Sequence, residues 1–198
     1  MEILFPVLVS GITIGAVYAL IALGFVLIYK SSGVFNLAQG EFLLFGACIG
    51  WTLTSLMGLN PWLGLLLAIS LCAILGLVVE RLVMRPMIGE PLLAAVMITI
   101  ALSLLLKGIL VGIWPEQFYS FPQWLAGEPL ILGGTSISKE IILTCIAAIL
   151  LVIAFILFFK YTKRGLGMRA TAEDHQVSQA SGISVKGVFA TCWCLAAI

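Results

Sequence analysis

The chain has 198 residues, of which 62% are hydrophobic and 10% are charged, and its formal net charge is +1. Soluble domains carry about 25% charged residues, so this composition excludes an ordinary globular domain and indicates an integral membrane protein. The mean hydropathy of +1.22 agrees with that class. Nothing in the sequence resembles the basic footprint of a nucleic-acid-binding protein, so the expected surroundings are a lipid bilayer and no nucleic acid.

Hydropathy predicts an all-α fold, a polytopic transmembrane helical bundle with about five complete spans and the start of a sixth. A spanning helix needs roughly 20 mostly apolar residues. Stretches of that kind cover residues 3–29, 34–57, 61–79, 92–114 and 141–159. A sixth begins near Gly187, and what remains of the chain is too short to span. We therefore expect a single transmembrane domain over residues 1–198 that is incomplete at its C-terminal end.

The Lys and Arg residues predict how the spans are oriented. We take the polar segment 160–186 to be cytoplasmic. Alternation of the spans then places Lys30, Arg81 and Arg85 on the same side. Lys139 is the only cation left in an external loop, as the positive-inside rule requires. If the second span is broken or re-entrant, the parity before it reverses.

Glycines at four-residue spacing recur in three of the spans. The pairs are Gly11 and Gly15, Gly46 and Gly50, and Gly108 and Gly112. Small residues spaced in this way let two transmembrane helices approach closely, so the pattern is one that contacts inside a bundle would use.

Polar residues at the start of the second span are the first candidates for a function. Asn36, Gln39, Gly40 and Glu41 fall in the first turns of an otherwise apolar stretch. A carboxylate at membrane depth is costly and normally faces a bundle interior or a water-filled path. We therefore assign these residues to the translocation path or the bundle interior. The alternative is that Glu41 lies near the interface and pairs with Lys30 or a lipid headgroup.

Glu80, Arg81 and Arg85 close the third span. On a continuing α-helix Arg81 and Arg85 lie on nearly the same face, so one anionic partner could meet both. The alternative, which the residue types favour, is a routine cytoplasmic anchor in which Pro86 stops the helix.

The polar segment 160–186 is too polar for lipid and too short to be a domain. Gly165 and Gly167 are expected to break the helix that continues from the fifth span. A short helix is then predicted over residues 168–180, with Gly182 as its C-terminal stop.

Arg169 and Glu173 share one face of this predicted helix and can pair across a turn. Ala170 and Ala172 keep the helix slim, which suits insertion into a groove on another protein. A solvated cytoplasmic loop that carries topology-setting charges explains the same residues. The residue pattern does not separate these two interpretations.

The sequence offers no catalytic or metal-binding set, so we expect neither enzymatic activity nor a metal. The five cysteines fit no metal or redox spacing, and His175, the sole histidine, has no second ligand beside it. The phosphate-binding pattern GxxxxGKS/T is absent, so the chain itself is not expected to bind and hydrolyse ATP by that route.

Four separated motifs occur in order along the chain. They are Gly11-x-x-x-Gly15-Ala16-x-Tyr18-Ala19-Leu20, Phe35-Asn36-Leu37-Ala38-Gln39-Gly40-Glu41, Glu80-Arg81 with Arg85-Pro86, and Thr162-x-x-Gly165-x-x-x-Arg169-Ala170-x-Ala172-Glu173-Asp174 with Ala180-x-Gly182-Ile183. On these motifs the chain resembles the membrane permease subunits of bacterial branched-chain amino acid ABC importers, most closely the shorter of their two paired permeases. The resemblance runs through essentially the whole chain.

The resemblance implies three kinds of protein partner for this chain in the bacterial inner (plasma) membrane: a second permease subunit, two cytoplasmic ABC ATPases and an external substrate-binding protein. ATP is bound by the ATPases, so no cofactor is expected here. Segment 160–186 would dock into the ATPases through Gly165, Arg169, Ala170, Ala172, Glu173, Asp174 and Gly182. Relatives continue for about three further spans, so the resemblance also implies a C-terminal truncation.

Two other functions stay open on the residues alone. One is an ion- or proton-coupled secondary transporter with Glu41 in its path, and the other is a membrane scaffold or fragment without transport activity. The substrate is equally open, because similar permeases serve branched-chain amino acids, other amino acids, amides or urea.

Overall fold

The structure, a computed structural model, describes residues 4–115, 119, 130–132, 135–137, 139–173 and 175–198. These residues are almost entirely helical, with one short hairpin. The helices are α1 (Leu4–Ser32), α2 (Gln39–Trp51), α3 (Pro61–Val79), α4 (Leu92–Ile113), α5 (Lys139–Tyr161), α6 (Lys163–Glu173), α7 (His175–Ala180) and α8 (Val185–Ala197). The hairpin pairs two antiparallel strands, β1 (Leu130–Leu132) and β2 (Thr135–Ile137).

Four helical stretches in the described part of the chain are long and apolar enough to cross a membrane: Val7–Ser32, Pro61–Met87, Leu92–Ile113 and Ile142–Tyr161. The expected all-α polytopic bundle is therefore confirmed, and four of its five expected spans with it. The second expected span differs, because α2 begins at Gln39 rather than near Val34 and has only 13 residues. A π-helical turn over Thr52–Leu56 extends it.

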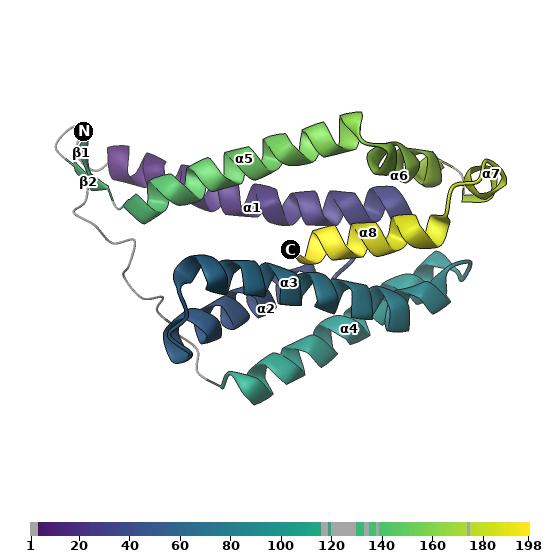
Figure 1. Ribbon diagram of the computed structural model, residues 1–198, viewed down its shortest axis with the longest axis horizontal. Helices are drawn as coiled ribbons and strands as arrows, with labels where there is room; N and C mark the ends of the chain where they lie inside the picture. Colours follow the sequence, from purple (N-terminus) through teal and green to yellow (C-terminus); the bar gives the residue numbers. More distant parts are fainter. Residues whose placement is uncertain (1–3, 116–118, 120–129, 133–134, 138, 174) are drawn as a thin grey trace.

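The helices pack in three layers (Figure 1). α1 and α5 lie side by side in one layer, α2, α3 and α4 form another, and α8 lies between them with contacts to α1, α2 and α3. α1, α3 and α5 run toward the end of the bundle where α6 and α7 lie, while α2, α4 and α8 run away from it. Successive helices therefore alternate in direction, and the break after α1 does not reverse the parity.

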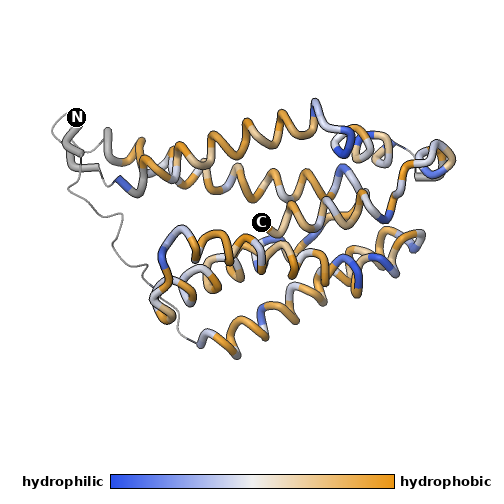
Figure 2. The backbone as a smooth tube through the Cα atoms, viewed as in Figure 1, coloured by the Kyte–Doolittle hydropathy of each residue, from blue (hydrophilic) through white to orange (hydrophobic). Residues whose placement is uncertain are grey.

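One end of the bundle gathers the basic residues. The last turn of α1 carries Lys30, the end of the third span carries Arg81 and Arg85, and α6 follows at the same end. Figure 2 shows hydrophilic residues collected there and hydrophobic ones along the middle of the helices. We call this the basic end of the bundle. The positive-inside rule predicts that it faces the cytoplasm.

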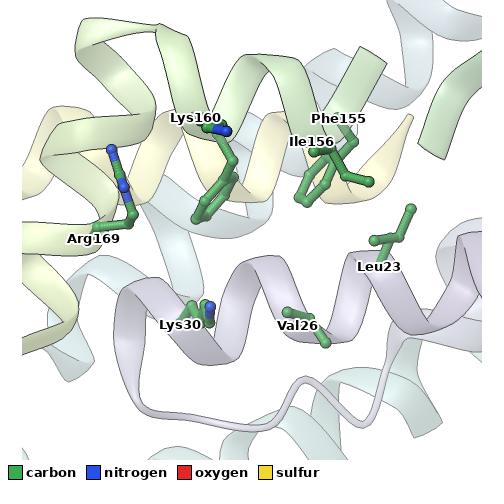
Figure 3. Close-up of a pocket in the computed structure, with 8 residues that line it drawn as sticks. Leu23, Val26, Lys30, Phe155, Ile156, Lys160 and Arg169 are labelled. Carbon is green, nitrogen blue, oxygen red and sulfur yellow. The ribbon is translucent and has the colours of Figure 1, made fainter. Parts of the chain in front are cut away.

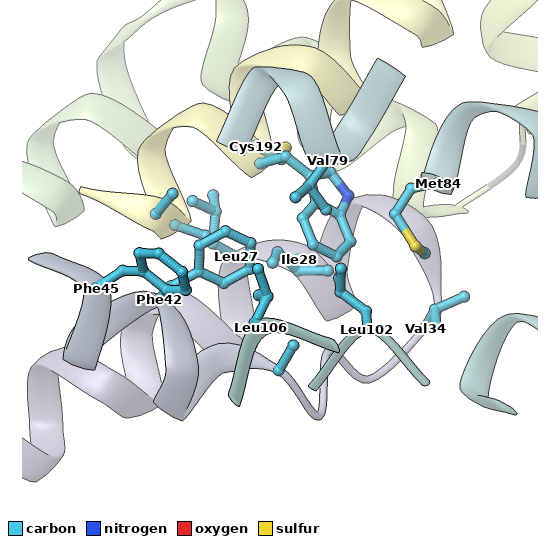
Figure 4. Close-up of a cluster of buried hydrophobic side chains, with 14 of the residues drawn as sticks. Leu27, Ile28, Val34, Phe42, Phe45, Val79, Met84, Leu102, Leu106 and Cys192 are labelled. Atoms are coloured by element: carbon cyan, nitrogen blue, oxygen red, sulfur yellow. The ribbon is translucent and has the colours of Figure 1, made fainter. Parts of the chain in front are cut away.

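Trp193 of α8 lies at the centre of the buried core. It is 1% exposed, and its ring meets the Phe42 ring edge-on at a centroid distance of 6.2 Å, among side chains such as Leu27 and Leu106 (Figure 4). Gly76 of α3 permits the approach of α8, because a Cβ there would lie 2.5 Å from the Trp193 carbonyl oxygen. Lipid is as apolar as these side chains, so close packing of this kind stabilises a membrane bundle.

The spaced glycines of the sequence make few of the close contacts. A Cβ added at Gly11, Gly15, Gly108 or Gly112 would meet nothing within 4 Å, and one at Gly46 would make an ordinary contact. The tight approaches use single glycines instead, at Gly24, Gly64, Gly76 and Gly165. The spacing of glycines in the sequence indicates that a helix has a stripe of small residues, but not whether that stripe faces a neighbouring helix.

The helix of α3 continues beyond its expected end at Val79. A π-helical turn over Glu80–Met84 and a 3₁₀ turn over Arg85–Met87 carry it to Met87. Pro86 lies in the first turn of this 3₁₀ segment, a place where its missing N–H is tolerated. The helix therefore passes through Glu80 and Arg85 instead of stopping before them.

Candidate functional site

A break between α1 and α2 puts non-helical backbone inside the bundle. At the end of α1 the hydroxyls of Ser31 and Ser32 donate to the Ile28 carbonyl, at 2.9 and 2.7 Å. Gly33 then has a φ of 70°, in the left-handed region that glycine adopts without steric cost. The chain continues without helix until Gln39.

Asn36 organises this break. It is fully buried, its Oδ1 accepts from the Ala38 N–H at 3.1 Å, and its Nδ2 donates to Gln39 Oε1 at 3.2 Å. Gln39 is 5% exposed and donates from Nε2 to the Ala196 carbonyl of α8 at 2.7 Å. A buried amide costs free energy unless it is hydrogen-bonded. These bonds therefore keep two polar side chains inside the bundle and tie the break to α8.

Two other helices complete the surroundings of the break. The Thr99 hydroxyl of α4 lies 3.2 Å from the Phe35 carbonyl oxygen and 2.8 Å from the Val96 carbonyl oxygen of its own helix, so its hydrogen is shared between them. Gly24 of α1 leaves room for Gln39, because a Cβ there would overlap the Gln39 amide. Non-helical backbone at membrane depth is tolerated only where protein surrounds it or where it lines a water-filled cavity. Transporters use breaks of this kind to bind substrates and ions.

The other two predicted residues of this set do not join the buried network. Glu41, in the first turn of α2, is half-buried and accepts from the Ser103 hydroxyl of α4 at 3.3 Å. Within the described residues it forms no ion pair with Lys30. Gly40 is on the exposed side of α2, where an added Cβ would meet nothing within 4 Å.

Glu80 and Arg85 form an ion pair at the basic end. Arg85 donates from Nε and Nη2 to the two carboxylate oxygens of Glu80, at 3.0 and 2.9 Å, and Glu80 is 1% exposed. The π-helical turn aligns residues five apart, whereas an α-helix aligns residues four apart. Arg81 is exposed and Arg85 is half-buried. Glu80 already pairs with Arg85, and whether one anionic partner meets both arginines stays a prediction.

The polar segment turns sharply after α5. The Thr162 hydroxyl donates to the Phe158 carbonyl at 2.6 Å and accepts from the Gly165 N–H at 2.9 Å, as the cap at a helix N-terminus does. α6 begins at the next residue, and Gly165 and Gly167 lie inside it. The expectation that these glycines break the helix is wrong, because the break falls at Thr162.

The two glycines differ in what surrounds them. Gly165 is buried, and a Cβ there would lie 2.7 Å from the carbonyl oxygens of Phe158 and Phe159. A Cβ at Gly167 would make an ordinary contact, 3.5 Å from Val188 of α8. Gly165 is therefore the residue that lets α6 lie tightly against the end of α5.

α6 has one buried and one exposed face. The buried residues, toward α1, α5 and α8, are Gly165, Gly167, Met168 and Thr171. The exposed residues among those predicted to meet an ATPase are Arg169, Ala172 and Glu173. Ala170 is half-buried, and Asp174 lies outside the described residues. Arg169 and Glu173 form no ion pair with each other in this part of the structure.

Gly182 ends α7, as expected from the sequence. Its φ is 81°, its N–H donates to the Gln179 carbonyl at 3.0 Å, and the Ile183 N–H donates to the Ser178 carbonyl at 3.0 Å. These two bonds make a Schellman motif, a common end of α-helices. The single helix predicted over residues 168–180 is in fact two, α6 and α7.

The residues that close the break from neighbouring helices were not predicted. They are Gly24, Thr99, Ser103 and Ala196. Each is an ordinary residue of a transmembrane helix, and only the four-residue spacing of Thr99 and Ser103 could have indicated a shared face on α4. Among the described residues, no group of three or more His, Cys, Asp or Glu is placed to hold a metal ion.

Residues 7–198 match a protein family described as branched-chain amino acid transport system / permease component. The chain is 29% identical over 195 residues to the high-affinity branched-chain amino acid transport system permease protein BraD of Pseudomonas aeruginosa, covering 92% of this chain and 64% of that protein. To LivH of Escherichia coli K12 it is 27% identical over 194 residues, with 91% and 63% covered. A probable LivH of Methanocaldococcus jannaschii is 29% identical over 197 residues, with 96% and 61% covered.

The chain thus spans a little under two thirds of the length of these relatives. No solved structure matches it. The matched residues include the break, the ion pair at the basic end and the α6–α7 segment. The chain belongs to the family of permease components of branched-chain amino acid transport systems, and it is a multi-pass protein of the inner membrane.

Proposed function

We propose that this chain forms part of the translocation path of an ATP-binding-cassette importer for amino acids of the branched-chain type, and that α6 with α7 couples the path to cytoplasmic ATPases. The observation that carries the coupling role is the two-sided packing of α6 at the basic end. One face is held against α1, α5 and α8, while Arg169, Ala172 and Glu173 remain exposed. A helix held in this way can move the bundle when a partner moves the helix.

Contacts lead from α6 to the break. Gly165 rests on the backbone at the end of α5, and Gly167 faces Val188 of α8. α8 in turn accepts a hydrogen bond from Gln39 through its Ala196 carbonyl. A displacement of α6 would therefore act on α8 and on the non-helical segment that Gln39 helps to hold. In this proposal the break is the element that has different arrangements when the path opens to each side of the membrane.

ATP-driven closure of the ATPases would shift the bundle between outward-open and inward-open states. Such a shift requires that ATP and the transported molecule bind the two states with different affinities. The chain would work with a second permease, two ATPases that bind the ATP, and an external substrate-binding protein, and would need no cofactor of its own. The wide exposed sides of the helices suit this, since the apolar length of α5 is almost entirely exposed.

Co-purification of the full chain with its ATPases tests the coupling role. Glu173→Lys on the exposed face of α6 should weaken recovery of a subunit that carries a GxxxxGKS/T loop by about tenfold, because it reverses a charge in the proposed contact. Glu90→Lys is the matched control, since Glu90 is exposed on the same side of the membrane and lies outside α6 and α7. ATPase recovery that is equal for the two variants would contradict the proposal.

Uptake into proteoliposomes that contain the assembled complex tests the energy source. Uptake of leucine should require ATP inside the vesicle compartment that the ATPases face and should survive collapse of ion gradients by ionophores. Uptake that follows an imposed proton or ion gradient without ATP hydrolysis would instead establish a secondary transporter, for which Glu41→Gln would be the diagnostic loss.

A further inference from the structure

A shallow groove of about 260 Å³ lies between α1 and α5 at the basic end, beside α6. Its floor is apolar and is formed by Leu23, Val26, Phe155, Ile156 and Phe159. Three cations line the same groove, Lys30 from the last turn of α1, Lys160 from the last turn of α5, and Arg169 from α6. Figure 3 shows Leu23, Val26 and Lys30 in a row along α1, facing Phe155 and Lys160 on α5, with Arg169 at one end.

The charge of the groove is unbalanced. No Asp or Glu lines it, and none of the three cations forms an ion pair with a described residue. All three residues are exposed, so their charged groups are free to meet an anion. The Lys160 ammonium also lies 5.5 Å from the centroid of the exposed Tyr161 ring, and Tyr next to Lys is typical of the level where a membrane meets water.

We propose that this groove binds an anionic phospholipid of the leaflet at the basic end. The headgroup phosphate would meet Lys30, Lys160 and Arg169, and one acyl chain would lie along the apolar floor between α1 and α5. Basic pockets between transmembrane helices on the cytoplasmic side bind anionic lipid headgroups in this manner.

The lining of the groove fits a phospholipid better than it fits other anions. A free phosphate would contact the three cations and leave the apolar floor without a partner. An extended acidic protein segment would bring unpaired backbone N–H and C=O groups against the apolar floor, which offers them no hydrogen-bond partner. A phospholipid carries a negative phosphate and an apolar chain in the same order as the groove presents cations and apolar side chains.

Such a lipid would bridge three elements that already contact one another. Lys30, Lys160 and Arg169 belong to α1, α5 and α6, so one phosphate would hold the start of the polar segment against both helices. Arg169 belongs both to this groove and to the exposed face of α6, whereas Lys30 and Lys160 belong to the groove alone. Failure of the coupling experiment above would leave the lipid site untouched, because Glu173 does not line the groove.

Native mass spectrometry of the full chain released from detergent measures the binding. Phosphatidylglycerol should remain bound where phosphatidylcholine of the same chain length does not. Lys30→Gln with Lys160→Gln should weaken phosphatidylglycerol binding about 25-fold, since each basic residue near an anionic surface contributes about fivefold. Lys163→Gln with Lys186→Gln is the matched control, because it removes the same charge from exposed residues at the same end that do not line the groove.

The apolar floor has its own test. Ile156→Trp should fill the groove and weaken phosphatidylglycerol binding while leaving all cations in place. Leu157→Trp is its control, as Leu157 is similarly exposed on α5 but does not line the groove. Competition by glycerol 3-phosphate at equal concentration should be negligible.

Three results would overturn the proposal. Equal retention of phosphatidylglycerol and phosphatidylcholine would mean a non-selective lipid contact. Equal loss in the two double-lysine variants would mean a diffuse basic surface, and full competition by glycerol 3-phosphate would mean a site for a free phosphate. Labelling of the unmodified chain by photoactivatable phosphatidylglycerol tests the site without any variant that could misfold. The label should appear on peptides of α1 and α5 around Val26 and Ile156, and not on all lipid-facing helices alike.

Discussion

The break after α1, at residues 33–38, and the α6–α7 segment are two places where polar residues interrupt an apolar chain. In the break, Asn36 is fully buried and its amide is hydrogen-bonded within the protein, and Gln39 beside it reaches α8. In α6, Arg169 and Glu173 are exposed and form no ion pair with each other. The first region holds its polar groups inward, and the second presents them outward.

This difference shows how each region is anchored. Buried amides must find partners inside the protein, so the break depends on residues from α1, α4 and α8. The α6 helix is anchored by its buried face, where Gly165 and Gly167 lie beside the fully buried Met168, and its charged residues are exposed. Substitutions near the break should therefore reduce the free energy of unfolding, whereas those on the exposed face of α6 should change it little.

The largest expected effect follows Gly24→Leu. A side chain there would overlap the Gln39 amide, so the variant both overpacks the site and breaks the Gln39 hydrogen bonds. We expect a loss of about 3 kcal/mol in the free energy of unfolding, at the upper end for an overpacked core. Unfolding in mixed micelles with rising SDS measures it.

Gly11→Leu on the same helix is the control for Gly24→Leu. A Cβ at Gly11 meets nothing within 4 Å, so this variant changes helix propensity and lipid contact but no packing. Equal destabilisation by the two variants would show that the break does not depend on the space that Gly24 leaves.

The second expected effect is on the free energy of unfolding, which alanine should raise at one glycine of α6 and lower at its neighbour. Alanine in place of a helical glycine ordinarily gains up to about 1 kcal/mol. Gly167→Ala should show that gain, because its Cβ would make an ordinary contact. Gly165→Ala should instead lose about 2 kcal/mol, since backbone carbonyls of Phe158 and Phe159 stand in the way and cannot move aside as a flexible side chain would.

The same SDS titration measures the free energy of unfolding of both alanine variants of α6. A stabilised Gly165→Ala would mean that α6 does not lie against the end of α5 as described. That outcome would also remove the first step of the proposed route from α6 to the break, because Gly165 makes the contact between these helices.

Hydropathy was sufficient to predict the helical class, four spans and the polar segment, because apolar length is a local property of the sequence. It could not place the start of α2, since the residues from Val34 to Ala38 are as apolar as a helix interior apart from Asn36. Gln39 donates to the carbonyl of a residue 157 positions away, and no local pattern specifies that partner. Likewise, the pairing of Glu80 with Arg85 required knowledge of the π-helical turn.

The smallest effect tests the hydrogen bond from α4 to the break. Thr99→Val keeps the shape of the side chain and removes a hydroxyl whose hydrogen is shared between the Phe35 carbonyl, 3.2 Å away, and the Val96 carbonyl of its own helix, 2.8 Å away. A typical protein hydrogen bond contributes about 1 kcal/mol, so we expect a loss of that size in the free energy of unfolding. Thr191→Val is the control, because the Thr191 hydroxyl bonds only to Gly187 in its own helix. If Thr191→Val costs as much as Thr99→Val, the bond to Phe35 contributes nothing specific, and the break is held by Asn36 and Gln39 without help from α4.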